Sequence, residues 1–224
     1  MQASMETLFD VVYLSTVIVL GISMIKGAKG NKQYLLFGIM AVVLGAGDAF
    51  HLVPRAIALS TTGLENFPVA LGIGKFITSL TMTFFYILLY YVWRQRYTIE
   101  GKQKLTATVY LLAAARIVLC LFPQNAWTTA NAPVSWGIYR NIPFALLGLV
   151  IIVLFYHSAK DHDDHAFRFM WLTIVLSFAL YIPVVLWANA FPLIGILMIP
   201  KTLAYVWTVF IGYSDMRKSL QKAA

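Results

Sequence analysis

Apolar residues fall in seven runs along the chain, separated by short polar connectors. The runs cover residues 7–26, 33–57, 68–93, 104–123, 137–158, 166–188 and 192–214. A bilayer core is ~30 Å thick, so a helix that crosses it needs about 20 mostly apolar residues. The pattern therefore predicts an all-α, polytopic membrane protein in which residues 1–224 form a single seven-helix transmembrane domain.

Composition supports this prediction. The 224 residues are 60% apolar and only 12% charged, less charge than the surface of a soluble domain needs. The one cysteine, Cys120, allows no internal disulfide. The first apolar run follows acidic rather than basic residues, so we do not expect a cleavable signal peptide.

The basic residues predict the orientation in the membrane. Twelve of the 17 Lys and Arg residues lie in the connectors after runs one, three and five and in the C-terminal tail. The connectors after runs two, four and six carry none. By the positive-inside rule, we expect the N-terminus outside and the C-terminus in the cytoplasm. The net charge of +8 then reflects topology, and we expect no nucleic-acid partner. The predicted location is the plasma membrane, as a multi-pass protein typical of a bacterial cytoplasmic membrane.

The other five basic residues lie inside the apolar runs or at their edges, on five different helices. They are Arg55, Lys75, Arg116, Arg140 and Lys201. At a rise of ~1.5 Å per residue, all five fall in the outer half of the bundle. Ionisable groups in a membrane are rare and mark functional sites. We therefore predict an outward-facing, basic polar pocket, to which Tyr181 and Tyr205 also contribute.

The stretch GAGDAFHLVPR, residues 45–55, carries the candidate catalytic groups. Asp48, His51 and Arg55 stand at i, i+3 and i+7 and so share one helix face. Asp48 can act as a general acid or base, with His51 as its orienter or proton relay.

Simpler interpretations of these charges remain open. Arg55, Arg140 and Lys75 can extend to the outer headgroups without further function. Lys201 or Arg116 can form an internal ion pair with Asp48 that only fixes the packing. His51 can be a hydrogen-bonded core histidine.

We expect no cofactor and no metal ion. A lysine on the seventh helix suggests retinal, but helix three brings Lys75 instead of a carboxylate counterion. The seventh run has no histidine, so His51 cannot complete the zinc set of ceramidase-type hydrolases. The connector KDHDDH, residues 160–165, is an alternative metal site, although a solvated charged loop is the simpler interpretation.

One segment resembles a known family. Gly47, Asp48, Pro54 and Arg55 are similar to the G-D-x-x-x-L-x-P-R helix of lysoplasmalogenase-type membrane proteins, and residues 72–86 occupy the following helix. The similarity covers about 40 of the 224 residues; Lys75 departs from it, and no matching second acid occurs late in the chain. It implies a hydrolase that cleaves the vinyl ether of lysoplasmalogens. A family of uncharacterised seven-span bacterial proteins fits equally well.

Two hypotheses follow from these observations. In the first, the pocket binds an anionic amphiphile such as a lysophospholipid, and Asp48 and His51 hydrolyse it. In the second, a non-enzymatic seven-helix sensor or carrier binds a small anion in the same pocket. The expected partners are membrane lipids and this anionic ligand.

Overall fold

The computed structural model describes residues 2–188 and 190–222, and seven long helices make up most of them. The helices are α1 (Gln2–Gly27), α2 (Lys32–Ser60), α3 (Pro68–Arg96), α4 (Gln103–Leu121), α5 (Val134–Asp161), α6 (Met170–Trp187) and α7 (Met198–Lys222). Each is long and apolar enough to cross a membrane. This result confirms the predicted all-α fold with seven spanning helices.

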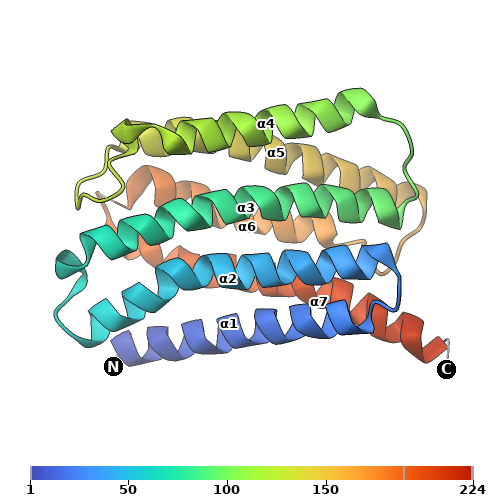
Figure 1. Ribbon diagram of the computed structural model, residues 1–224, viewed down its shortest axis with the longest axis horizontal. Coiled ribbons are helices and arrows are strands. Elements are labelled where there is room, and N and C mark those ends of the chain that lie inside the picture. Colours follow the sequence, from blue (N-terminus) through green and yellow to red (C-terminus); the bar gives the residue numbers. More distant parts are fainter. Residues whose placement is uncertain (1, 189, 223–224) are drawn as a thin grey trace.

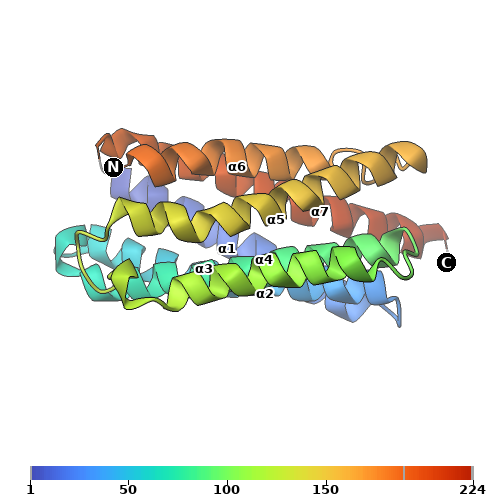
Figure 2. The same ribbon diagram turned by 90° about the horizontal axis from the view of Figure 1, so that it is seen from above.

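The helices run antiparallel to their chain neighbours and form one elongated bundle (Figure 1). Consecutive helices pack against each other, and α7 packs against both α1 and α2, which brings the two ends of the chain together laterally. α3 also contacts α5 across the bundle. In the second view, α6 lies along one side of the bundle and α2 and α4 along the other (Figure 2).

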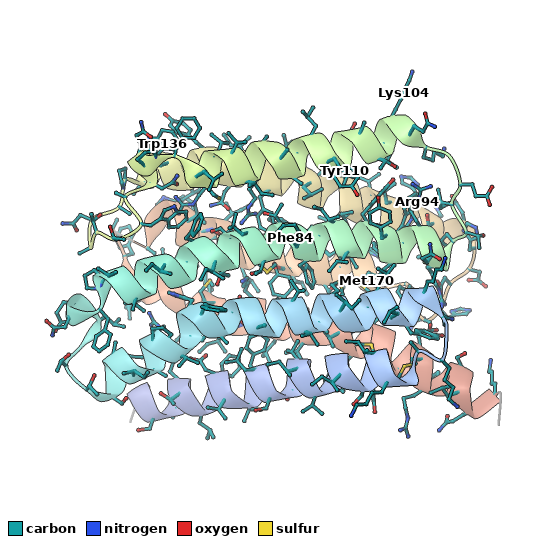
Figure 3. The ribbon with its side chains drawn as sticks, viewed as in Figure 1. Phe84, Arg94, Lys104, Tyr110, Trp136 and Met170 are labelled. Atoms are coloured by element: carbon teal, nitrogen blue, oxygen red, sulfur yellow. The ribbon has the colours of Figure 1, made fainter. Side chains whose placement is uncertain are left out.

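The two ends of the bundle differ in composition. We call the end that holds the N-terminus the N-terminal face and the opposite end the C-terminal face (Figure 1). Arg94 and Lys104 lie at the C-terminal face, whereas Trp136 lies at the N-terminal face (Figure 3). Basic residues such as Arg94 and Lys104 are the basis on which the sequence predicts that the C-terminal face is cytoplasmic. The orientation in the membrane stays a prediction.

Small residues set the close packing of α2 on α3. A Cβ atom on Gly47 would overlap the side chain of Thr81, and one on Gly74 would overlap the backbone at Phe50. Thr78 adds a hydrogen bond from its hydroxyl to the Gly47 carbonyl, at 3.1 Å. Because the backbones approach here, the α2 face that carries Asp48 has a fixed position in the bundle.

Most helix ends differ from the predicted runs by a few residues, and the largest differences are in α6 and α7. α6 begins at Met170 rather than 166, because Asp164 holds the preceding turn by accepting hydrogen bonds from the backbone N–H groups of Ala166 and Phe167. α7 begins at Met198, after a 3₁₀ segment over Pro192–Leu197, and continues to Lys222, eight residues beyond the predicted end at 214.

Candidate functional site

Two cations lie deep inside the N-terminal half of the bundle. Arg116 of α4 is 2% exposed and Lys201 of α7 is 7% exposed. Among the described residues, neither forms an ion pair with a carboxylate within 4.0 Å. The internal pairs of Asp48 with Lys201 or Arg116, considered above, therefore do not form.

Aromatic rings connect these two cations. The Arg116 guanidinium carbon lies 3.3 Å from the centroid of the Phe144 ring, and that ring lies 6.4 Å from Tyr181. The Lys201 ammonium lies 5.6 Å from the Tyr181 centroid and 4.8 Å from that of Tyr205. The structure thus brings together four of the predicted ligand residues, Arg116, Tyr181, Lys201 and Tyr205, from three helices.

Several buried donors in this region have no acceptor. Nε and Nη1 of Arg116 and the hydroxyl of Tyr86 are buried without a hydrogen-bond partner in the described part of the chain. Tyr86 packs edge-on to Phe144, with centroids 5.0 Å apart, so its hydroxyl belongs to the same cluster. Buried polar groups in proteins are nearly always hydrogen-bonded, so three unpaired donors in one cluster need an explanation. The predicted ligand set lacks Tyr86, although this tyrosine follows Lys75 at helical spacing along the same apolar run.

The acidic part of the site is larger than predicted. Asp48 is buried and accepts a 2.6 Å hydrogen bond from the hydroxyl of Tyr13 on α1. Asp10, one turn before Tyr13, is also buried, and its Oδ2 has no partner within the described residues. The predicted site does not include Asp10, which α1 (Gln2–Gly27) places among the buried residues.

His51 does not contact Asp48 by a hydrogen bond. Its Nδ1 lies 3.3 Å from the carbonyl oxygen of Leu71 on α3. That carbonyl can only accept, so Nδ1 carries the proton and Nε2 remains available. The geometry agrees with a hydrogen-bonded packing histidine, and the relay role of His51 remains a prediction.

The other three predicted cations are peripheral. Arg55 forms an ion pair with Glu6 of α1, and Lys75 is exposed on the surface of α3. Nη1 of Arg140 donates a 2.8 Å hydrogen bond to Oδ1 of Asn125, and its guanidinium carbon lies 4.3 Å from the Trp127 ring centroid. These residues surround the N-terminal end of the site, and Arg116 and Lys201 form its interior.

A second polar cluster lies at the C-terminal face and was not predicted. Arg96 of α3 binds Asp164 through Nε at 2.8 Å and Nη2 at 2.9 Å, and binds Asp215 of α7 through Nη1 at 2.7 Å. Tyr97 donates to Asp164 at 3.0 Å, and Tyr34 of α2 donates to Asp215 at 3.0 Å. We call these five residues the Arg96 cluster; they join α2, α3, α7 and the connector before α6.

The Arg96 cluster changes the interpretation of the KDHDDH connector. Asp164 is engaged by Arg96, and no group of three His, Cys, Asp or Glu residues within 2–188 and 190–222 is placed to hold a metal ion. Burial alone would raise the pKa of Asp164, but the hydrogen bond and charge of Arg96 outweigh it, and the pKa is lowered overall. Burial and the neighbouring Asp164 raise the pKa of Tyr97.

Two surface grooves, of about 250 and 340 Å³, lie at the C-terminal face and not beside Arg116. The outward-facing pocket therefore remains a prediction. No family model matches the chain, and neither a curated protein nor a solved structure matches it.

Proposed function

We propose that this integral membrane protein binds the anionic headgroup of an amphiphile inside the N-terminal half of its bundle. The observation that carries the proposal is the set of three buried, unpaired donors on Arg116 and Tyr86. A phosphate or carboxylate supplies the acceptor oxygens that these donors lack. It also supplies the negative charge that Arg116 and Lys201 lack.

Electrostatics favour this occupant. Burying a cation without a partner is strongly unfavourable, whereas charge-assisted hydrogen bonds are about twice as strong as neutral ones. The Arg116 guanidinium carries charged N–H donors, which pair favourably with the oxygens of a phosphate or carboxylate. Lys201 on α7 adds a second positive charge to that of Arg116 on α4.

The surroundings favour an amphiphile over a small hydrated ion. The rings of Phe85, Phe144 and Phe178 pack around Tyr86, at centroid distances of 5.4, 5.0 and 5.7 Å. An acyl or alkenyl chain can pack against these aromatic rings. The surrounding membrane is a direct source of lysophospholipids. The resemblance of the Asp48 segment to lysoplasmalogenases supports the same ligand class.

We further propose hydrolysis of the bound lysolipid, with Asp48 as the acid. For a vinyl ether, the Asp48 carboxyl gives its proton to the β-carbon of the double bond, and water adds to the oxygen-bearing carbon. The hemiacetal then separates into an aldehyde and the glycerol hydroxyl, and the proton lost by the water restores the acid. Asp10 is a second buried carboxyl, one turn before the Tyr13 that bonds to Asp48, and it is a candidate partner of that acid.

The alternative is a non-enzymatic sensor or carrier for a small anion, in which Asp48 is only a counter-ion for Lys201. The variant Asp48→Asn distinguishes the two. Under the hydrolase proposal it abolishes aldehyde release from lysoplasmalogen and leaves anion binding in place. Under the alternative it changes affinity alone, and the wild type releases no aldehyde.

Ligand-dependent stabilisation tests the binding step. Purified protein in neutral detergent is heated with and without lysophosphatidylglycerol, and Arg116→Gln is compared with Lys104→Gln, which removes an exposed charge at the C-terminal face. Ligand at 100 times its Kd stabilises by about 2.7 kcal/mol. We expect this shift in the wild type and in Lys104→Gln, and its loss in Arg116→Gln. Equal shifts in all three proteins would contradict the proposal.

A further inference from the structure

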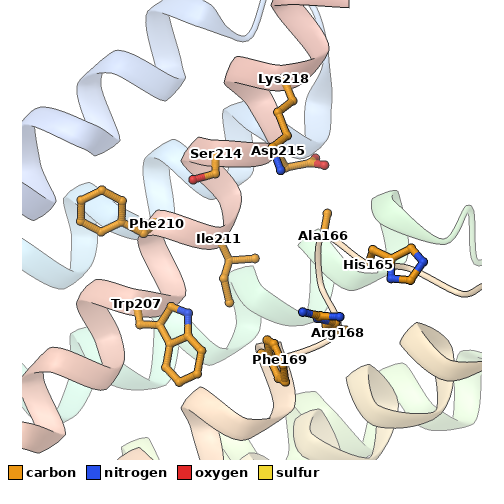
Figure 4. A pocket seen from close by; sticks show the side chains of 10 residues that line it. All are labelled: His165, Ala166, Arg168, Phe169, Trp207, Phe210, Ile211, Ser214, Asp215 and Lys218. Atoms are coloured by element: carbon orange, nitrogen blue, oxygen red, sulfur yellow. The ribbon is translucent and has the colours of Figure 1, made fainter.

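A groove opens at the C-terminal face between α7 and the connector that precedes α6 (Figure 4). Its volume is about 250 Å³. It lies at the opposite end of the bundle from Arg116 and Lys201, so nothing in it depends on the proposed function.

The polar end of the groove is basic. Arg168 and Lys218 line it from the connector and from α7, and among the described residues neither forms an ion pair. The one carboxylate in the lining, Asp215, is already bound to Arg96 at 2.7 Å. The groove therefore offers two uncompensated cations together with the hydroxyl of Ser214.

The other end of the groove is apolar. Trp207, Ile211, Ser214 and Lys218 follow one another along α7 at spacings of four, three and four, so they form one stripe that changes from aromatic to basic. Phe169 faces Trp207 from the other wall, with ring centroids 6.0 Å apart. Both aromatic side chains are exposed on the surface of the bundle. The adjoining helices α6 and α7 are apolar enough to cross a membrane, so these side chains can face lipid.

We propose that this groove binds an anionic phospholipid of the leaflet at the C-terminal face. Arg168 and Lys218 bind the phosphate, and the glycerol and the first part of an acyl chain lie along Trp207 and Phe169. Charge complementarity selects the anionic lipid, because a cationic Arg–Lys pair attracts the net negative headgroup more strongly than a zwitterionic one. Aromatic residues at headgroup depth are typical of membrane interfaces.

Native mass spectrometry with an equal mixture of phosphatidylglycerol and phosphatidylcholine tests the proposal. The wild type is compared with Arg168→Gln/Lys218→Gln and with the matched control Lys32→Gln/Lys104→Gln, whose exposed lysines lie at the same face outside the groove. At ~1 kcal/mol per cation near the lipid, we expect the groove variant to weaken phosphatidylglycerol binding about tenfold or more. The control should bind as the wild type does.

A neutral variant separates the groove from overall charge. Ser214→Trp fills the groove without changing charge, and we expect it to lose phosphatidylglycerol binding while its thermal unfolding remains close to that of the wild type. The proposal is overturned by equal loss in the groove and control variants, by equal binding of the two lipids, or by unchanged lipid binding in Ser214→Trp. Displacement of the lipid by millimolar inorganic phosphate alone would identify a free-anion site and likewise overturn it.

Discussion

Tyr13 donates a 2.6 Å hydrogen bond to Oδ2 of Asp48, and this bond joins α1 to α2 inside the bundle. Both residues are buried, at 3% and 8% exposure. The bond fixes the position of the one acid that the proposed hydrolysis requires, so it couples the packing of α1 to the site.

Tyr13→Phe tests this coupling. Removing the hydroxyl leaves a buried carboxylate oxygen without its donor, which costs about 1–3 kcal/mol. We expect lower thermal stability in detergent and slower release of aldehyde from lysoplasmalogen. Tyr110→Phe is the matched control, because it deletes an exposed hydroxyl that bonds to Tyr91, and it should change stability by less than about 0.5 kcal/mol. Equal effects of the two substitutions would show that the Tyr13 bond is unimportant.

Arg96→Gln tests the Arg96 cluster. The substitution leaves Asp164 and Asp215, whose side chains are 8% and 13% exposed, without their shared cation. Removing one partner of a buried ion pair costs about 3–5 kcal/mol. We expect thermal unfolding in detergent at a clearly lower temperature. Arg94→Gln serves as the control, because this neighbouring arginine donates to neutral acceptors, the carbonyls of Ile99 and Gly101 and the Thr106 hydroxyl. A larger loss in Arg94→Gln than in Arg96→Gln would contradict the assignment.

The same cluster predicts an acid-dependent loss of stability. The pKa of Asp164 is lower in the folded protein than its ordinary value of about 3.9. A lowered carboxyl pKa contributes stability above the ordinary value, and this contribution disappears as the pH falls through the folded value. Thermal unfolding between pH 7 and pH 2.5 should therefore show a decrease below about pH 4 that is smaller in Asp164→Asn. An identical decrease in both proteins would exclude Asp164 as its source.

The seven helices were predictable, because the thickness of a bilayer imposes the length of the apolar runs. Asp10 was not, because an acid near the start of an apolar run looks like part of a solvated terminus until the helix boundary is known. The Arg96 cluster was missed for another reason. Its contacts depend on which residues of distant helices meet, and no periodicity within one helix encodes that.

Cysteine labelling tests the predicted orientation. In a Cys120→Ala background, Thr129→Cys places a thiol in the exposed α4–α5 connector at the N-terminal face, and Ser219→Cys places one near the end of α7. On intact cells, a membrane-impermeant maleimide should label the Thr129→Cys protein, and it should label the Ser219→Cys protein only after the membrane is opened. The reverse pattern would invert the topology and place the Arg116 site in the cytoplasmic half.

The most direct test of the anionic ligand is to extract the purified protein and identify what it carries by mass spectrometry. Wild type is compared with Arg116→Met/Lys201→Met, in which both buried cations are removed and comparable stability is verified by thermal unfolding. We predict that the wild type and Lys32→Gln/Lys104→Gln carry more of a specific anionic lipid than the double variant, in which only lipid bound at the Arg168/Lys218 groove remains. The same lipid content in all three proteins, or none in any, would contradict the proposal that Arg116 and Lys201 form a ligand site.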